Sequence, residues 1–505
     1  MNGLLSPLYN GASISLSTLH PADNDSFFQM LPEAINDGWH VSSYFGVPHG
    51  TGAELYCVLT SKSDGVIGVA RTSVDKSFPS LAEACPQLQL FEREIAEQCA
   101  LTPERHPWLK PVRFHRPFGK QRSYWHDLDG DGLLPGVMPY YQVEGAEVHE
   151  VAVGPVHAGV IEPGHFRFQC HGEEVFSLEI SLGFQHRGIE QAMIGGPYPE
   201  TMYQMEAIAG DTTIGHAQAY CMAIETLAGG RVPPHAEVVR GIALELERLA
   251  NHAGDLGAIA GDVGYLPTAS FCGRIRGDFL NMSAVICGSR FGRGVVRPGG
   301  VGFACVQRQA DELLKRLAAV RDDLANAVEL LWSTPSVMAR LEDVGTVSAD
   351  TAREIGLVGP AARACGLNRD VRRDYPYGIF RMSQIPVVTA QSGDVYARTM
   401  LRWLEAERSM NFIEEQLRQL PAGDILTAPG DIAANSLAVT LTEGWRGEIC
   451  HTAITDDAGR FRRYKIVDPS FHNWQGLSLA LRGEQISDFP LCNKSFNLSY
   501  CGFDL

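Results

Sequence analysis

The stretches GPVHAGVIEPGHFRF at residues 154–168 and MEAIAGDTTIGHAQAYCMAIE at residues 205–225 decide the fold. The first stretch lies within residues 151–179, where short apolar runs separated by turn residues predict β-strands. Beyond that region, apolar residues at helical spacing dominate. A small β segment followed by a mainly helical domain is therefore expected.

Three long stretches of the C-terminal half have the pattern of amphipathic helices. They cover residues 234–265, 305–335 and 395–421, and the second ends near Pro335. Their apolar residues recur every three or four positions, as in Val238, Ile242, Leu246, Leu249 and Ala253. Such stripes predict that the three helices pack together as a bundle.

The N-terminal part has a different pattern. Short apolar runs within residues 17–70, such as GAELYCVLTS, predict strands, and residues 77–107 contain a predicted amphipathic helix with charged residues between apolar ones. Residues 116–150 are rich in Gly, Pro and Asp and are expected to form a linker. The predicted fold class is α+β, with a small mixed α/β domain at 1–115, the linker, and a helical-bundle domain with a short β segment at 151–505.

Composition excludes several classes of function. The net charge of -17 argues against a nucleic-acid partner and against direct binding to an anionic bilayer. No apolar stretch reaches the roughly 20 residues that a membrane span needs. The 12 cysteines include no C-x-x-C pair, so neither a zinc site nor an iron–sulfur ligand set is expected. Scattered thiols without a basic signal sequence predict a cytoplasmic protein.

Further blocks accompany the two opening stretches in a fixed order, namely ELERLANHAGDLGAIAGDVG (245–264), RFGRGVVRPGGVGF (290–303), GDVYARTMLRWLE (393–405) and DPSFHNWQGL (468–477). Together they resemble the large subunit shared by group 4 membrane-bound [NiFe]-hydrogenases and by the quinone module of complex I, where it is the 49-kDa subunit. The N-terminal SFPS and FERE motifs resemble the 30-kDa subunit of complex I. In formate hydrogenlyase-type complexes that small domain is fused ahead of the large one, and this chain resembles the fused form.

The resemblance implies a site for nickel and iron held by four cysteines, and this sequence departs from that pattern. The first pair of positions holds Ala209 and Thr212, and the C-terminal pair holds Ser499 and Gly502. Cys501 is one residue out of frame. Methyl and hydroxyl groups do not hold soft nickel, so no metal is expected in this chain.

The resemblance to complex I implies a quinone site held by a histidine and a tyrosine, and only the histidine is retained. His165 matches the histidine that holds the quinone headgroup, whereas Gly210 stands where a tyrosine is expected. Asp211, Thr212 and His216 form a polar set at the emptied metal pocket. The candidate catalytic residues are therefore His165, Asp211 and His216.

Two further groups of ionisable residues allow alternative interpretations. His186, Arg187 and Glu190 stand at helical spacing and either line a proton route or form an Arg187–Glu190 pair that braces a helix. His252 matches a histidine that in complex I lies near the iron–sulfur cluster of the adjacent subunit; the alternative is a histidine satisfied inside a helical interface.

Arg446 stands where hydrogenases place an arginine over the cyanide ligands of the iron. Without the metal, a structural ion pair with a carboxylate such as Glu443 or Asp211 is expected.

The resemblance implies the large subunit of a membrane-associated oxidoreductase that has lost nickel. Its expected partners are a small subunit with a [4Fe–4S] cluster, similar to the 20-kDa subunit of complex I, a ferredoxin-like subunit, and membrane antiporter-like and anchor subunits at the inner face of the cytoplasmic membrane. Quinone is a candidate acceptor, and any NADH would bind another chain. One alternative is a non-catalytic scaffold. Another, a working hydrogenase of formate hydrogenlyase type, is opposed by the missing ligands.

Overall fold

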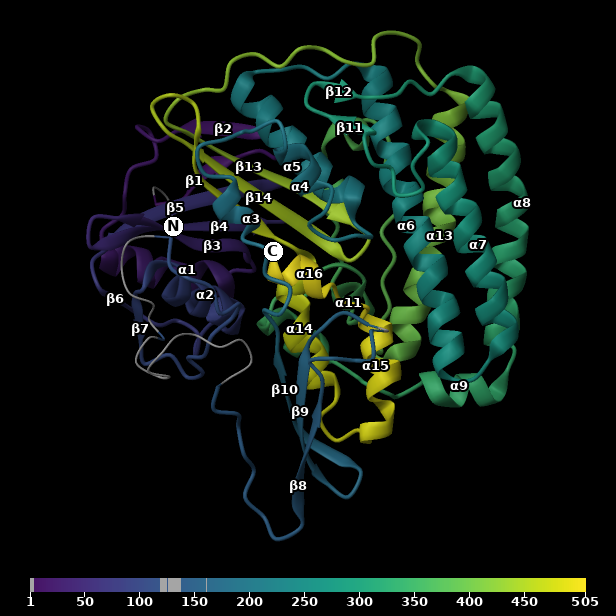
Figure 1. Ribbon diagram of the computed structural model, residues 1–505, viewed down its shortest axis with the longest axis horizontal. Coiled ribbons are helices and arrows are strands. Elements are labelled where there is room, and N and C mark those ends of the chain that lie inside the picture. The colour runs from purple at the N-terminus through teal and green to yellow at the C-terminus, as the bar shows by residue number, and fades with distance from the viewer. Residues whose placement is uncertain (1–3, 119–124, 126–137, 160) are drawn as a thin grey trace.

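The computed structural model describes residues 4–118, 125, 138–159 and 161–505. Figure 1 shows long helices packed side by side at one edge of the molecule and two sheets with covering helices at the other. The C-terminus lies between these two parts, near the centre of the view. Helices and strands are both abundant and the sheets are largely antiparallel, so the predicted α+β class is confirmed at this level.

The N-terminal part contains an antiparallel sheet of order β1-β5-β4-β3. Its strands are β1 (Ser6–Leu8), β3 (His40–His49), β4 (Gly52–Ser61) and β5 (Val66–Val74), so the strands expected in 17–70 are confirmed. Helix α1 (Asn24–Asn36) was not expected there; Asp23 caps it by accepting a hydrogen bond from the amide of Ser26. Short strands β6 (Ser77–Pro79) and β7 (Thr102–Glu104) form a parallel pair.

Helix α2 (Gln89–Cys99) confirms the predicted helix, but its charged residues do not face solvent. Glu92, Glu94 and Glu97 are fully buried, each with 0% of its surface exposed. Glu94 forms ion pairs with Arg113 and with Lys465 of the C-terminal sheet. The helix is therefore an internal layer of the molecule, covered on its polar side by the rest of the chain.

Strands β8 (Val148–Val153), β9 (His165–His171) and β10 (Glu174–Ser181) form a three-stranded antiparallel sheet, as the pattern in 151–179 predicted. This sheet extends away from the body of the molecule at the bottom of Figure 1. Residues 119–124 and 126–137 of the expected linker lie outside the described residues.

The predicted bundle is confirmed and is larger than expected. Helices α6 (Pro234–Asp262), α8 (Gln307–Trp332) and α13 (Val395–Arg418) match the three predicted stretches. Helix α7 (Leu266–Cys287), packed along α6, was missed because Gly273 and Gly277 interrupt its apolar pattern. Within the described residues, no helix is both long enough and apolar enough to cross a membrane.

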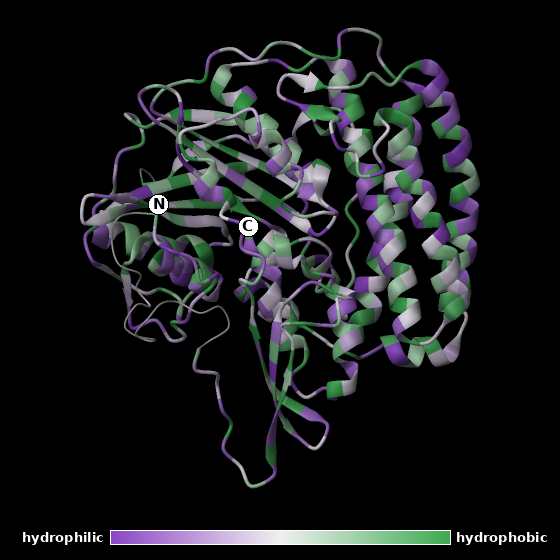
Figure 2. Cartoon of the chain, in the orientation of Figure 1, coloured by the Kyte–Doolittle hydropathy of each residue, from purple (hydrophilic) through white to green (hydrophobic). Residues whose placement is uncertain are grey.

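A further four-stranded antiparallel sheet, of order β15-β14-β13-β2, was also missed. It consists of β13 (Ser436–Gly444), β14 (Gly447–Thr455), β15 (Phe461–Val467) and, from the N-terminal part, β2 (Ala12–Ser15). Helix α5 (Thr213–Ala228) packs on one face of this sheet, and the strands are coloured mainly white to green in Figure 2. The large part of the chain is therefore less exclusively helical than expected, and residues before 115 contribute to it. The expected domain division remains a prediction.

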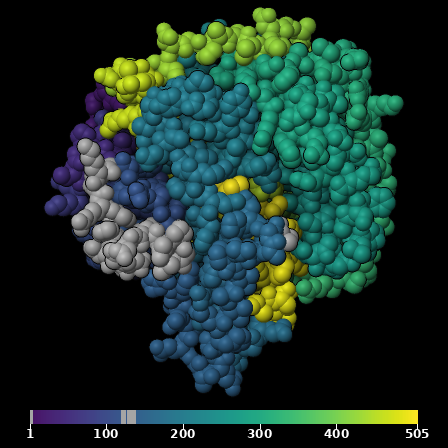
Figure 3. Space-filling view, in the orientation of Figure 1, coloured from purple at the N-terminus to yellow at the C-terminus, as the bar shows by residue number. Residues whose placement is uncertain are grey.

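Shorter elements connect these parts. They are α3 (Ile189–Ala192), α4 (Thr201–Met205), β11 (Val296–Arg297), β12 (Gly300–Val301), α9 (Pro335–Leu341), α10 (Ala349–Glu354), α11 (Gly359–Ala364), α12 (Val371–Asp374), α14 (Pro469–Ala480), α15 (Phe489–Phe496), α16 (Tyr500–Asp504) and the 3-10 turns η1 (Pro86–Leu88), η2 (Gly378–Arg381) and η3 (Ile486–Asp488). On the face shown in Figure 3, most of the yellow C-terminal segment is covered by the residues coloured blue and teal.

Candidate functional site

The loop before α5 and the segment that leads into α16 meet, although almost 300 residues separate them. Arg187 joins them: its guanidinium donates to the carbonyl oxygens of Ala207 at 2.6 Å, of Ile208 at 2.8 Å and of Cys501 at 2.8 Å. The four positions where the resemblance implies nickel ligands thus belong to one region of the structure.

None of these four positions offers a soft ligand. Ala209 and Thr212 are buried, and the Ser499 hydroxyl accepts a hydrogen bond from the amide of Gly502 at 2.9 Å, which caps α16. A Cβ atom at Gly502 would lie 2.7 Å from Cγ and from Oδ2 of Asp468. The Asp468 carboxylate therefore occupies the space that a side chain at 502 would need.

The side chains at these four positions also lack the donor atoms that a nickel–iron centre needs. A methyl group, two hydroxyls and a glycine do not fit a nickel–iron centre. Within the part of the chain that the structure describes, no three His, Cys, Asp or Glu side chains are grouped so that they could hold a metal ion. We therefore derive no chemistry from a metal in this chain.

Arg446 closes one side of the region by pairing with Asp211, one of its two expected partners. Its two terminal nitrogens lie 2.6 Å and 2.7 Å from the two carboxylate oxygens of Asp211, a bidentate geometry. The guanidinium also stacks 3.9 Å from the ring centroid of Trp445. Glu443, the other expected partner, pairs instead with Arg363 at 2.8 Å.

His216 is buried behind this pair and has two polar partners. Its Nε2 lies 3.0 Å from Oδ2 of Asp468, and its Nδ1 lies 3.1 Å from Nε2 of His451. Nδ1 of His451 lies 2.9 Å from the hydroxyl of Tyr464. Burial raises the pKa of Asp468, but the bond to His216 and the charge of Arg446 lower it overall.

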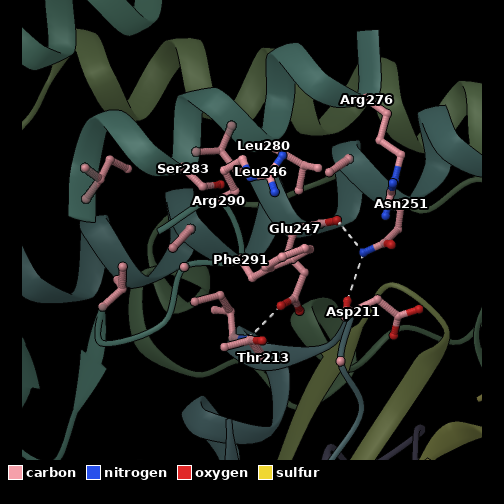
Figure 4. A pocket seen from close by; sticks show the side chains of 17 residues that line it. Asp211, Thr213, Leu246, Glu247, Asn251, Arg276, Leu280, Ser283, Arg290 and Phe291 are labelled. Carbon is pink, nitrogen blue, oxygen red and sulfur yellow. Dashed lines mark hydrogen bonds between the residues drawn. The ribbon is translucent and has the colours of Figure 1, made fainter. Parts of the chain in front are cut away.

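A pocket opens beside Gly210 and Asp211, between α5, α6, α7 and the loop before β11 (Figure 4). Glu247 of α6 lines it and caps α5, because its carboxylate accepts hydrogen bonds from the amides of Ile214 at 2.6 Å and Gly215 at 3.2 Å. Burial raises the pKa of Glu247 to about 8, against the effect of these two amides. A Cβ atom at Gly210 would meet no other heavy atom within 4 Å.

His165, at the start of β9, is not joined to Asp211 or His216 by any hydrogen bond within the described residues. Its Nδ1 lies 3.1 Å from the carbonyl oxygen of Gly154, and Nε of Arg167 donates to its Nε2 at 3.3 Å. Burial, with the charge of Arg167, lowers the pKa of His165 despite the bond to Gly154. Both ring nitrogens of the predicted quinone ligand are thus already engaged.

Among the described residues, the three members of the predicted proton route form no hydrogen bond or ion pair with one another, and the Arg187–Glu190 pair is absent, although His186 and Glu190 border the same pocket. Nδ1 of His186 lies 2.7 Å from the carbonyl oxygen of Asp504, and burial lowers the pKa of His186 to about 4. Glu190 pairs with Arg463 and Lys465 at 2.9 Å and 3.0 Å. Burial would raise the pKa of Glu190, but these two cations lower it well below its ordinary value. A carboxylate held ionised in this way favours a structural role.

His252 lies inside the molecule, with none of its surface exposed. Its Nε2 lies 2.9 Å from Oε2 of Glu405, and its ring contacts Trp445 edge-on. A histidine enclosed in this way does not reach a cluster in another chain. The geometry favours the alternative of an internal histidine, with a carboxylate rather than the backbone as its partner.

Four residues of this region did not emerge as candidates from the sequence: Glu247, His451, Tyr464 and Asp468. Asp468 precedes a proline and a helix, which marks it as an N-cap, and its side chain does accept from the amide of Ser470. His451 and Tyr464 lie in the sheet that the sequence did not predict. The hairpin signal was present, as two apolar runs separated by the turn around Trp445 and Arg446.

These features define a class of protein: a large-subunit scaffold in which the loop before a buried helix lies beside the C-terminal segment and borders a pocket next to the bundle of α6, α7, α8 and α13. Known proteins agree with this class. The family model described as "Respiratory-chain NADH dehydrogenase, 49 Kd subunit" matches residues 262–436 and 427–504.

Individual relatives extend the match. The chain is 31% identical to "Carbon monoxide-induced hydrogenase" of Rhodospirillum rubrum, over 69% of this chain and 97% of that protein. It is 29% identical to "Formate hydrogenlyase subunit 5" of Escherichia coli over 93% of this chain and 86% of that protein, and 29% identical to "NADH-quinone oxidoreductase subunit 4" of Thermus thermophilus over 68% and 90%. The chain belongs to the family of large subunits that complex I shares with membrane-bound, formate hydrogenlyase-type hydrogenases.

Proposed function

We propose that this chain is the large subunit of a membrane-associated oxidoreductase, related to complex I and to group 4 hydrogenases, that has lost the nickel–iron site. The observation that carries the proposal is the filled ligand position: the carboxylate of Asp468 lies where a side chain at Gly502 would project. Ala209, Thr212 and Ser499 supply no thiolate at the other three positions.

Electrons would arrive from a [4Fe–4S] cluster in a partner small subunit. The relatives named as subunits of hydrogenlyase and NADH-quinone oxidoreductase support such partners. The pocket mouth offers a suitable surface, since Phe291 is 40% exposed and the neighbouring Arg290 and Arg293 are also exposed. A ferredoxin-like subunit and membrane antiporter-like and anchor subunits would complete the complex at the cytoplasmic face of the membrane.

Quinone is the proposed acceptor, and the pocket beside Gly210, which is lined mainly by apolar side chains, is its proposed site. Because both nitrogens of His165 are engaged, His165 would have to release Arg167 or the Gly154 carbonyl to hold a quinone. Decylubiquinone reduction by the purified complex, compared with that of His165→Ala, tests this role. Unchanged turnover in the variant removes His165 from the quinone site.

Metal analysis and copurification test the proposal as a whole. The complex is purified through a tag on a partner subunit, its subunits are identified, and its nickel and iron are measured per chain. We expect iron from the partner clusters and nickel far below one atom per chain. Stoichiometric nickel would overturn the loss of the metal site.

A non-catalytic scaffold is the second candidate, and two sets of contacts favour it. The bidentate Arg446–Asp211 pair and the bridge made by Arg187 tie together the segments that enclose a metal in the resembling hydrogenases. A scaffold predicts that the complex assembles normally and that no variant of the pocket changes electron transfer. Asp211→Asn discriminates: changed turnover in an intact complex favours the enzyme.

A further inference from the structure

A cleft of about 640 Å³ lies between β10, α14 and the N-terminal part of the chain. Seven consecutive residues, 176–182, line it, and all but the last belong to β10. Successive side chains of a strand point to opposite faces of its sheet, so an unbroken run of lining residues means that the cleft follows the edge of the strand. β10 is such an edge strand, because it pairs only with β9 among the described residues.

The chain itself covers only the start of this edge. The amide of Val175 donates to the carbonyl oxygen of Glu484 at 2.9 Å, and the amide of Gly483 donates to that of Val175 at 2.8 Å. A bulge follows Val175. Beyond it, the described residues outside the ladder make one hydrogen bond to the backbone of 176–182, from the hydroxyl of Ser478 to the carbonyl oxygen of Leu178.

Backbone groups of Leu178 and Ile180 are therefore left for another chain. The carbonyl of Leu178 points away from β9, and in an antiparallel pair the amide of the same residue then does so too, as do both groups of Ile180. Unpaired groups along a strand edge are a template for pairing with a further strand. At about 3.3 Å per residue, residues 176–182 offer about 20 Å of edge, the length of an ordinary strand.

Arg93 of α2 borders the same cleft and retains an unused donor. It is 8% exposed; its Nε donates to the carbonyl oxygen of Lys110 and its Nη2 to that of Pro111, both at 2.8 Å. Within the part of the chain that the structure describes, Nη1 has no hydrogen-bond partner and the guanidinium has no ion pair. Buried Arg398 also lacks a carboxylate, but all three of its nitrogens donate hydrogen bonds.

The two carboxylates that act on the charge of Arg93 are engaged with other groups. Glu97 accepts hydrogen bonds from the three backbone amides of residues 112–114, and Glu179 pairs with Lys110 at 2.6 Å. Burial lowers the pKa of Arg93 to about 10 despite these carboxylates, so the guanidinium remains charged at neutral pH. A carboxylate from another chain would complete its pairing.

Aromatic side chains surround the mouth of the cleft. Trp108, Tyr141 and Phe176 all line it and are 36%, 49% and 40% exposed. Exposed aromatic residues are enriched where proteins bind one another. A lipid chain requires apolar walls alone, whereas backbone donors and acceptors and a cation face this cleft. The combination favours a polypeptide with an acidic side chain.

We propose that the edge of β10 from Phe176 to Leu182 docks an extended segment of a partner subunit, which adds a strand to the sheet and places a carboxylate on Nη1 of Arg93. Main-chain hydrogen bonds to Leu178 and Ile180 supply affinity, and the acidic side chain fixes the register. The inference rests on the proposed function only for the existence of partner subunits. It requires neither a quinone nor a metal.

Photo-crosslinking of the complex, purified through a tag on this chain, identifies the occupant. The photoreactive residue p-benzoylphenylalanine replaces Phe176, and mass spectrometry identifies the captured peptides. We expect one segment of a partner subunit that contains Asp or Glu. Tyr9, which is 70% exposed and lies outside the cleft, is the control position and should not capture that segment. Capture of lipid, of a second copy of this chain or of no polypeptide would overturn the docking site.

Arg93→Gln tests the ion pair. A synthetic peptide of the captured segment should bind the full-length variant about 10- to 100-fold more weakly than the wild type, because a hydrogen bond between charged groups is lost. Arg398→Gln is the control matched for burial and should bind the peptide as the wild type does. Replacing the acidic residue of the peptide by its amide should weaken binding to the wild type but not to Arg93→Gln. Equal affinity of wild type and Arg93→Gln would remove Arg93 from the site.

Ile180→Pro tests the added strand and serves where Arg93→Gln does not fold. It removes an amide that faces the cleft and no ladder bond, so it should weaken peptide binding about 3- to 10-fold. Unchanged affinity in the folded variant would overturn strand addition. A complex that captures the segment but does not reduce decylubiquinone keeps the docking site and loses the quinone proposal. A complex that reduces decylubiquinone without capture at Phe176 does the reverse.

Discussion

Gly502→Ala should destabilise the protein because its new methyl group overlaps the Asp468 carboxylate. The added Cβ would lie 2.7 Å from Cγ and Oδ2 of Asp468 and 2.9 Å from Oγ of Ser499. Relaxing the first contact to an ordinary separation of about 3.5 Å requires a shift of about 0.8 Å. The displaced Oδ2 atom is the one that His216 contacts at 3.0 Å.

The expected magnitude follows from three effects. Overpacking a filled site costs about 1–3 kcal/mol, and weakening the buried Asp468–His216 bond costs about 1–3 kcal/mol. Alanine is better than glycine in a helix by about 1 kcal/mol at most, and Gly502 lies in α16 without a positive φ. The free energy of unfolding should therefore fall by about 1–6 kcal/mol.

Equilibrium urea unfolding, followed by tryptophan fluorescence, measures this change, and the chain offers a matched control. Gly210→Ala adds the same methyl group in the loop before α5, where it meets no heavy atom within 4 Å. That variant should be neutral or more stable by up to about 1 kcal/mol. In an Asp468→Ala background the cost of Gly502→Ala should largely vanish. Equal stabilities of the two glycine variants would refute the claim that Asp468 fills the ligand position.

Three further predictions concern neighbouring contacts. Arg446→Lys should lower the free energy of unfolding by about 1–3 kcal/mol, because lysine loses the bidentate geometry on Asp211; Arg418→Lys on the surface is the control, and urea unfolding measures both. Glu247→Gln should flatten the pH dependence of Tm. Because the pKa of Glu247 is raised to about 8 in the folded protein, proton binding to Glu247 stabilises the wild type, fully so below about pH 4.5, and this contribution is lost as the pH rises through 8. Equal Tm differences between wild type and variant at pH 5 and pH 8 would contradict this assignment. His252→Gln should lower Tm yet leave the EPR midpoint potential of the partner cluster unchanged, since its Nε2 faces an internal carboxylate; a shifted potential would restore the cluster-tuning hypothesis.

Local patterns predicted the elements that face solvent on one side. In α8, Leu313, Leu317, Val320 and Leu324 are all buried, because one apolar stripe against a polar surface is the signal that periodicity detects. In α7 the buried positions include Thr268 and Cys272, and glycines interrupt the rest, so the same signal is weak. The residues of β13 are buried on both faces, so its sequence lacks the alternation that marks a half-exposed strand.

The pocket shows why a family resemblance predicts positions better than contacts. The resemblance named Thr212, Ser499 and Gly502, and the structure brings their segments together, because the loop and the C-terminus follow the backbone path of the whole scaffold. Their present neighbours depend on the chain's own substitutions. Because residue 502 is a glycine, the Asp468 carboxylate lies directly against it, and Oδ2 of Asp468 lies 3.0 Å from Nε2 of His216. A sequence names the residues at the four positions, but only packing shows that the Asp468 carboxylate occupies the space beside Gly502.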